Sequence, residues 1–252
     1  MSMIIEDKFQ AFSSAKRLPI VFCLDVSPSM GWKQSGSKSS IELLNEAVSG
    51  FIKELKDDPK ARAAAEIAFV TFSTKIEMDT EFESVSSISI PTFSPIKGGT
   101  QMATAVLRSI EKIEDRRKQL ENNEISYYAP FLVLVTDGNP DNNDDLTKQS
   151  QAMSLVKSHC DSHIGAQEII VPFIIGVGED VNVKTLNNYS AGFTNGFFHI
   201  KENTSKSSQF SKVFKMIGNS TKKSIHLNGS AQKIVNIIKN DMNDLLADLA
   251  GE

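Results

Sequence analysis

Carboxylate and hydroxyl side chains recur at three places in the sequence where they could bind one ion together. The first is Asp25-x-Ser27-x-Ser29, whose alternate spacing turns three side chains the same way in an extended segment. The others are Thr100, which follows two glycines, and Asp137. Oxygen ligands without His or Cys select a hard cation, and a compact six-coordinate site suits Mg²⁺ or Mn²⁺ better than Ca²⁺ or zinc. The sequence therefore predicts that these five residues are the metal ligands of a divalent-cation site.

Two continuous apolar runs must position the two carboxylates. Residues 19–24 end at Asp25, and residues 131–135 end just before Asp137. Runs of this kind are typical of parallel strands that are covered on both faces. Because ligands bind at the carboxyl ends of strands in doubly wound sheets, both aspartates are expected on the same edge.

Further strands and helices are expected to alternate along the chain. The other predicted strands are 67–72, an antiparallel edge segment at 75–82, 169–175 and 196–200. The predicted helices are about 41–55, with Ser39 and Glu42 as a capping box, 100–120, 146–159, 183–189 and 207–217. This alternation predicts an α/β fold: a doubly wound, mostly parallel sheet with one antiparallel edge strand and helices on both faces.

The expected domain is residues 17–220, with an N-terminal extension at 1–16 and a C-terminal extension at 221–252. The C-terminal extension has apolar residues at helical spacing and predicts an amphipathic helix. This helix either packs on the domain or on a second copy, or it docks a partner protein.

Composition narrows the classes of partner. The net charge of -4 and the pI near 5.7 argue against nucleic acid or an anionic membrane as the main partner. The two cysteines are too few for a disulfide framework and lack metal-binding spacing. The first residues lack a signal-peptide core, and no apolar run approaches the roughly 20 residues of a membrane span. A cytoplasmic location is the expectation.

The order of the motifs at Asp25, Thr100 and Asp137 resembles the metal-ion-dependent adhesion site of von Willebrand factor A domains. The resemblance implies that Ser27 and Ser29 bind the cation through their hydroxyls. It implies that Thr100 and the two aspartates bind directly or through water. It also implies a sixth position for an acidic side chain, Asp or Glu, of a protein partner.

The resemblance to the family covers roughly residues 16–220. Some segments also resemble a narrower group of the family, the bacterial tellurium-resistance-associated members called TerY-like. These segments are Leu18-Pro19, Asp57-Asp58-Pro59, Val70-Thr71-Phe72, Gly98-Gly99-Thr100 and residues 130–140. That group is cytoplasmic and often encoded beside kinase-like and phosphatase-like proteins, which the resemblance implies as partners. Pro28 departs from the glycine of many members and removes a backbone donor from the loop.

The expected function is a non-catalytic, metal-dependent protein-interaction module, with no catalytic residues, in a stress, tellurium-resistance or phosphorylation-linked system. One alternative is a Mg²⁺-dependent phosphatase or hydrolase with Asp25 as nucleophile. Phosphatases of the haloacid-dehalogenase type need a second carboxylate two residues on, where Ser27 stands, and no Lys or His is evidently placed to complete such chemistry. Another alternative is a metal-independent scaffold that binds through the C-terminal helix.

Two features beside the predicted site each have two interpretations. Trp32, the only tryptophan, either contacts a partner or covers the loop or the edge of the core. Residues 137–145 superficially resemble a calcium loop but lack glycine at the sixth place and glutamate at the twelfth, so a turn and helix cap are predicted.

Overall fold

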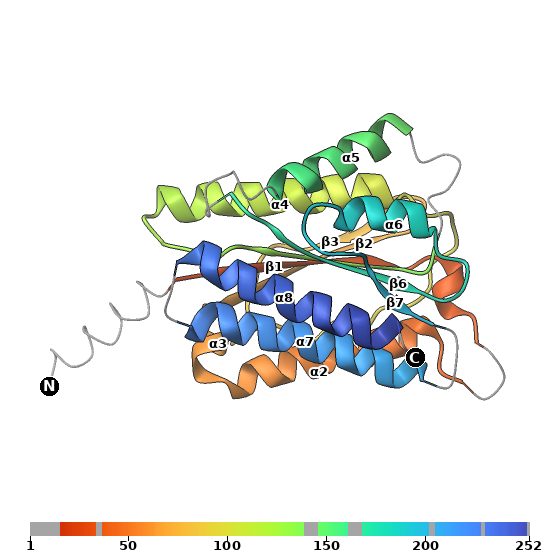
Figure 1. Ribbon diagram of the computed structural model, residues 1–252, viewed down its shortest axis with the longest axis horizontal. Helices are drawn as coiled ribbons and strands as arrows, with labels where there is room; N and C mark the ends of the chain where they lie inside the picture. The colour runs from red at the N-terminus through yellow and green to blue at the C-terminus, as the bar shows by residue number, and fades with distance from the viewer. Residues whose placement is uncertain are drawn as a thin grey trace, which may run out of the picture.

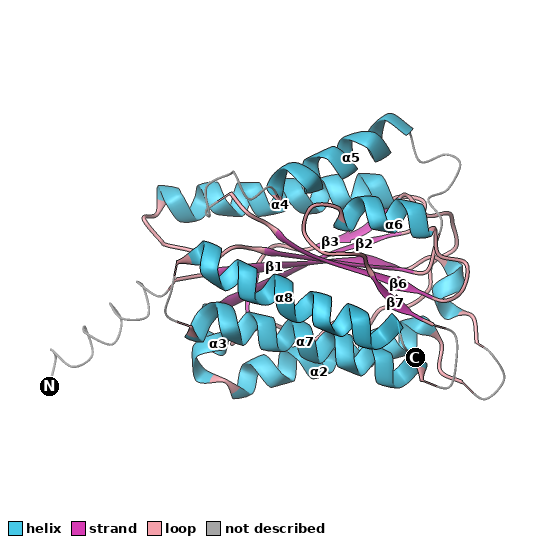
Figure 2. Cartoon of the chain, in the orientation of Figure 1, coloured by secondary structure: helices cyan, strands magenta, loops and turns pink. Residues whose placement is uncertain are grey.

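A seven-stranded sheet runs through the middle of the computed structural model, with helices above and below it (Figure 1, Figure 2). The structure describes residues 16–33, 37–138, 146–160, 168–201, 205–227 and 230–250. The strands are β1 (Leu18–Asp25), β2 (Ala65–Phe72), β3 (Ile76–Asp79), β4 (Glu83–Ser84), β5 (Phe131–Thr136), β6 (Val171–Val177) and β7 (Phe198–Ile200). The helices are the 3-10 turn η1 (Pro28–Gly31), α2 (Ser40–Asp57), α3 (Pro59–Ala64), α4 (Met102–Asn122), α5 (Leu146–His159), α6 (Val183–Ser190), α7 (Lys206–His226) and α8 (Ala231–Ala250).

The strand order is β3-β2-β1-β5-β6-β7, and all neighbours along it are parallel except β3. The antiparallel edge strand is confirmed at β3. The two-residue β4, which also pairs antiparallel with β2, was not expected as a separate strand. Strand order reverses between β1 and β5, which is where a doubly wound sheet leaves a crevice for a ligand. The fold class predicted from the sequence is confirmed.

The helices form one layer on each face of the sheet. Helices α4, α5 and α6 cover one face, and α2, α3, α7 and α8 cover the other (Figure 1). The predicted capping box of α2 is present: the Ser39 hydroxyl accepts from the Glu42 backbone, and the Glu42 carboxylate accepts from the Ser39 N–H at 2.9 Å. Helix α3 was not predicted from the sequence; its first N–H groups are capped by Asp58.

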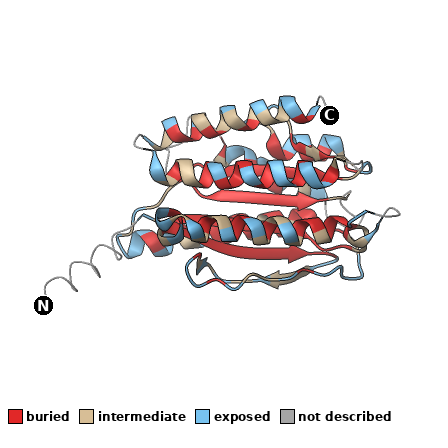
Figure 3. Cartoon of the chain, turned by 90° about the horizontal axis from the view of Figure 1, so that it is seen from below, coloured by how far each residue is buried: buried red, intermediate tan, exposed pale blue. Residues whose placement is uncertain are grey.

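The core lies between the sheet and these two layers. β1 and β2 are buried along their whole length, which explains why their sequences are continuously apolar rather than alternating. Phe22 of β1 contacts Phe51 of α2, with ring centroids 5.3 Å apart, and Phe214 of α7, at 6.2 Å. Figure 3 shows that buried residues alternate with exposed ones along the helices, so a helix has a buried side and an exposed side.

The C-terminal segment packs on the domain. α7 runs to His226, well past the predicted end at 217 and through the expected boundary at 220. α8 lies on α7 and near β7 (Figure 1). Its inward residues are buried: Ile234, Val235, Ile238, Met242 and Leu249. Of the interpretations given for this amphipathic helix, the structure therefore has the one in which the helix packs on its own domain. No helix in the described residues is long and apolar enough to cross a membrane.

Candidate cation site

Asp25 and Asp137 lie at the point where strand order reverses. Asp25 is the last residue of β1, and Asp137 follows the last residue of β5. The two strands are parallel neighbours, with Leu24 paired to Val135. The sheet therefore brings together two carboxylates that are 112 positions apart in the chain, as predicted (137 minus 25).

Hydrogen bonds hold the Asp25 carboxylate in one orientation. Its side chain is fully buried. Oδ1 accepts a 2.8 Å hydrogen bond from the Ser27 backbone N–H, and Oδ2 accepts one of 2.7 Å from the Thr136 hydroxyl. Thr136 in turn accepts from the Gly138 N–H at 3.1 Å. Thr136 thus positions a predicted ligand, although it was not itself predicted as a site residue.

The two serines and Asp137 form a short row of oxygen atoms. The hydroxyls of Ser27 and Ser29 are 3.1 Å apart, and the Ser29 hydroxyl donates to Oδ1 of Asp137 at 2.9 Å. Both distances are those of ordinary O–H···O hydrogen bonds, so the row brings these oxygen atoms together but does not select the size of an ion.

Thr100 reaches the same place from a loop that is tied to the end of β2. The Gln101 N–H donates to the Ser73 carbonyl at 2.7 Å. Gly98 has a φ of 155°, and a Cβ there would lie 1.9 Å from the Thr74 hydroxyl, so only glycine allows this approach. A Cβ on Gly138 would lie 3.4 Å from Oγ1 of Thr100 and 3.6 Å from Oδ2 of Asp25. The threonine hydroxyl and the aspartate therefore face the same small space.

Burial disfavours the charged form of both aspartates. Burial raises the pKa of Asp25, although the hydrogen bonds from Thr136 and Ser27 oppose the effect. Burial and the neighbouring Asp25 raise the pKa of Asp137 to about 7. Two carboxylates held close together in a low-dielectric setting would be stabilised by a divalent cation, whose charge they roughly neutralise.

Lys206 is a neighbour of the site that the sequence did not predict. It is the first residue of α7 and is buried, and its Nζ lies 3.0 Å from the Ser40 hydroxyl at the start of α2. Its positive charge lowers the pKa of Asp137, against the effect of burial. No local pattern in the sequence could reveal that Lys206 lies near Asp137. The two residues are 69 positions apart (206 minus 137), and Lys206 is on α7, a helix that packs against the sheet.

The donor set is compatible with a hard cation. In the described residues no group of three or more His, Cys, Asp or Glu side chains is placed to hold a metal. A cation site in these residues therefore needs hydroxyl ligands as well as carboxylates. The five predicted residues supply three hydroxyls and two carboxylates. Residues 139–145, which include most of the segment compared with a calcium loop, lie outside the described residues.

An opening of about 450 Å³ lies over the site and gives solvent access to it. Ser29, Thr100 and Asp137 form part of its lining. Around them the rim includes Trp32, Lys33, Glu179 and Asp180. The Trp32 side chain is 71% exposed, so it does not cover the core.

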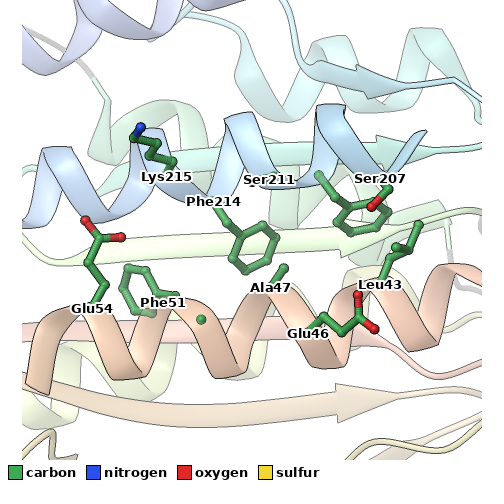
Figure 4. A pocket seen from close by; sticks show the side chains of 11 residues that line it. Leu43, Glu46, Ala47, Phe51, Glu54, Ser207, Ser211, Phe214 and Lys215 are labelled. Carbon is green, nitrogen blue, oxygen red and sulfur yellow. The ribbon is translucent and has the colours of Figure 1, made fainter. Parts of the chain in front are cut away.

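A second groove, between α2 and α7, lies on the face of the sheet that these helices cover (Figure 4). Phe51 and Phe214 lie in the groove, and Glu54 and Lys215 line it as well. None of the five predicted ligands lines this groove. It is therefore separate from the candidate cation site.

The fold agrees with the comparison to known families. The sequence model of the von Willebrand factor type A domain matches residues 20–214. The chain belongs to this family. The match runs from Ile20 in β1 to Phe214 in the first half of α7, and it includes all five candidate ligands. No curated protein sequence matches the chain significantly.

Solved structures with the same fold include domains of bacterial pilus proteins. The PilB minor pilin from Streptococcus sanguinis is similar with a TM-score of 0.54 and 13% identity, over 86% of this chain and 64% of the pilin. SpaC, a pilus adhesin from Lactobacillus rhamnosus GG, has a TM-score of 0.55 and 12% identity, over 83% of this chain and 31% of the adhesin. The vWF domain of the pili tip protein Mfa5 from Porphyromonas gingivalis has a TM-score of 0.51 and 11% identity, over 86% and 98%. At these identities the likeness concerns the fold alone, and the chain spans less than two thirds of the pilin and the adhesin.

Proposed function

We propose that this chain is a non-catalytic interaction module that binds a protein partner through one divalent cation, Mg²⁺ or Mn²⁺. The cation would be held by Asp25, Ser27, Ser29, Thr100 and Asp137, and a partner would complete its coordination with an Asp or Glu side chain. When bound, the ion supplies an electrophilic position at the bottom of the opening. The observation that carries the proposal is the row of oxygen atoms from Ser27 to Asp137, spaced at 3.1 and 2.9 Å.

Asp25 supports binding rather than turnover. A nucleophilic carboxylate needs an oxygen atom that faces the substrate. The Asp25 side chain has no exposed surface and does not line the opening, so a substrate in the opening would not reach it, whereas each hydrogen-bonded oxygen keeps a lone pair for an ion or for a water bound to the ion. A hydrolase that uses Asp25 as nucleophile is therefore the less favoured function, although Lys206 brings an ammonium group near the site. Absence of phosphate release from generic phosphoesters in Mg²⁺ would agree with this choice.

A metal-independent scaffold acting through the terminal helix is also less favoured. The apolar side of α8 is buried on the domain, so it is not available to a partner without displacing the helix. The narrower assignment is part of the proposal: a cytoplasmic, TerY-like protein whose partners include kinase-like or phosphatase-like proteins. It rests on the sequence segments quoted above.

Metal binding is tested directly with Mn²⁺, whose free ion is counted by electron paramagnetic resonance. Wild type is expected to bind one Mn²⁺ per chain, in competition with Mg²⁺. Asp25→Ala and Ser29→Ala should each weaken binding by at least about tenfold. Asp115→Asn, on an exposed carboxylate of α4, and Ser86→Ala, on an exposed serine, are matched controls that should leave binding unchanged.

Partner binding is tested by retention of proteins from native lysate on wild type, Asp25→Ala and Ser86→Ala, each in Mg²⁺ or in EDTA. Proteins held by wild type and Ser86→Ala in Mg²⁺ alone are the expected result. An identical set under all conditions would contradict a metal-dependent mechanism.

A further inference from the structure

Another opening lies at the edge of the sheet opposite to the candidate cation site, and we call it the end cavity. Its lining comes from the residues just before β1 and β5, from the last turns of α7 and from the start of α8 (Figure 1). Lining residues from these segments include Lys16, Tyr128, Ser224, Leu227, Ile234 and Val235. Because Asp25 and Asp137 stand at the ends of the same two strands, the length of the sheet separates the two openings.

The walls of the end cavity combine apolar side chains with a few polar groups, which is the usual composition of a binding pocket. The cavity measures about 330 Å³. An apolar cavity of about 150 Å³ holds a benzene ring, so the end cavity has room for about two aromatic rings. Leu227 on its wall is 41% exposed, whereas Ile234 and Val235 are buried. An occupant would therefore cover Leu227 and bury apolar surface of its own, which stabilises the contact.

Two hydroxyl groups of the end cavity are suited to contact with a peptide backbone. Ser224 is 4% exposed, and its side chain has no hydrogen-bond partner among the described residues. The Tyr128 hydroxyl lies 3.5 Å from the Ile225 carbonyl, at the outer limit of a hydrogen bond. Backbone N–H and C=O groups need partners when they are buried. These hydroxyls therefore favour a peptide segment over a purely hydrocarbon ligand.

The chain itself supplies a peptide segment that is attached at this cavity. Lys16 lines the cavity and is the first residue that the structure describes. Residues 1–15 lie outside the described residues, and their sequence contains Ile5, Phe9 and Phe12. These positions have the i, i+4, i+7 spacing of apolar anchors that bind in grooves. Phe12 stands four positions before Lys16 and is therefore at most about 14 Å from it, which is within reach of the opening.

Covalent attachment favours this segment over an independent occupant. A short flexible connection gives the attached segment an effective concentration on the order of millimolar. A partner protein or a second copy must first lose translational and rotational freedom to reach the same place. We propose that the end cavity binds the chain's own N-terminal residues, with Phe9 and Phe12 as the side chains that enter it. The contact joins the start of β1 to the end of α7 and the start of α8, and it does not involve the cation.

The test uses a nitroxide spin label attached at Gln10→Cys in the full chain, which leaves both phenylalanines in place. Both native cysteines are buried, so the introduced thiol takes the label. Nuclear magnetic resonance of the isotope-labelled protein then detects which backbone amide groups lie near the nitroxide. The amide signals of Leu227 and Ile234 should lose most of their intensity, whereas that of Trp32, at the other edge of the sheet, should keep it.

Two sets of substitutions in the spin-labelled chain separate docking from mere proximity. Phe9→Ala/Phe12→Ala should restore the weakened signals, because the segment no longer enters the cavity. Ser13→Ala/Ser14→Ala changes two polar residues of the same segment and is the matched control, in which the signals should stay weak.

Thermal unfolding of the unlabelled chain gives a second readout. A tenfold to hundredfold preference for the docked segment corresponds to a decrease of about 3–10 °C in melting temperature in Phe9→Ala/Phe12→Ala. Ser13→Ala/Ser14→Ala should leave the melting temperature unchanged. Ala231→Trp places a large side chain in the cavity from the start of α8. In that variant the phenylalanine substitutions should have no further effect, because the segment is already displaced.

Either of two results from a single chain would overturn the proposal: full intensity of the Leu227 and Ile234 signals, or a melting temperature that Phe9→Ala/Phe12→Ala does not lower. A mixture of spin-labelled chains with isotope-labelled chains that carry no nitroxide identifies a different occupant. Weakened signals in that mixture would assign the cavity to the segment of a second copy and also overturn the proposal. Mn²⁺ binding should be equal in all these variants, so failure here leaves the proposed cation site untouched.

Discussion

The Thr136 hydroxyl donates a 2.7 Å hydrogen bond to Oδ2 of Asp25, and so ties the end of β5 to the end of β1 at the reversal of strand order. Both residues are fully buried. The bond gives one oxygen of a buried carboxylate a fixed donor. Its partner on the other oxygen is the Ser27 N–H. Asp25 is therefore oriented by the protein before any ion arrives, which reduces the reorganisation that binding requires.

Thr136→Val keeps the shape of the side chain and removes this donor. We expect the free energy of unfolding of the metal-free protein to fall by about 1–3 kcal/mol, because a buried carboxylate loses a hydrogen bond. Mg²⁺ affinity, measured by calorimetry, should fall about tenfold. Thr221→Val is the matched control: Thr221 is buried on α7 and donates to the Ile217 carbonyl, far from the predicted ligands in sequence. Equal metal affinity in Thr136→Val and wild type would show that the bond does not orient Asp25 for binding.

Metal binding should depend on pH through Asp137, whose pKa is about 7. A raised pKa in the folded state contributes stability below the ordinary carboxyl pKa, and this contribution is lost as the pH rises through about 7. The metal-free protein therefore loses stability over this range, whereas Mg²⁺ needs the ionised form. We expect the increase in melting temperature caused by Mg²⁺ to be larger at about pH 8 than at about pH 6.

The comparison for this pH dependence is Asp137→Asn, which cannot ionise. The variant should lose most of the Mg²⁺-induced increase in melting temperature, and it should lack the difference between the two pH values. Differential scanning calorimetry of both proteins, in Mg²⁺ and in EDTA, measures the effect. A wild-type increase that does not change with pH would contradict the assignment of this ionisation to Asp137.

Gly98→Ala should destabilise the protein and weaken the site at once. A Cβ at Gly98 would overlap the Thr74 hydroxyl, and the φ of 155° is strained for alanine. We expect a loss of about 1–3 kcal/mol in urea unfolding and weaker Mn²⁺ binding, because the loop that carries Thr100 must move. Gly50→Ala is the control, and it should change stability in the opposite direction. Gly50 lies within α2 with no atom within 4 Å of an added Cβ, so the same substitution should stabilise by about 0.5–1 kcal/mol and leave binding unchanged.

Lys206→Met should raise the pKa of Asp137 above its wild-type value in the metal-free protein. The ammonium group of Lys206 lowers that pKa, so its removal takes away a favourable interaction with the ionised carboxylate. Titration of carbon-13-labelled aspartate by nuclear magnetic resonance measures the shift. Lys206→Arg keeps the charge and serves as the control. An unchanged Asp137 titration in Lys206→Met would show that the lysine is not electrostatically coupled to the site.

The residues of the candidate site were predictable because each motif stands at the end of an apolar run or after two glycines. Strand order in a doubly wound sheet then places the carboxyl ends of β1 and β5 side by side. The structure brings all five predicted residues to that edge. The strands were predictable for the same reason: residues buried on both faces must be continuously apolar, and this is visible in local sequence.

Other features depend on contacts between segments far apart in the chain. The end of α7 was predicted too early, because its last turns contain Thr221, Lys222 and Lys223 and read as polar. Those turns are nevertheless helical because α8 packs along them, and the Lys223 ammonium is paired with Asp241 of α8. Helix α3 was missed because it is short and begins at a proline that also ends α2.

The sequence by itself determined the alternation of strands and helices and the oxygen ligands available at the ends of two strands, because both are local patterns. Tertiary structure decided that Thr136 holds Asp25, that Lys206 reaches the site from α7, and that α8 covers the domain. It also placed Trp32, Glu179 and Asp180 around one opening. These relationships join residues that are tens of positions apart or more, and only the packing of the sheet and its helices brings them within reach of one another.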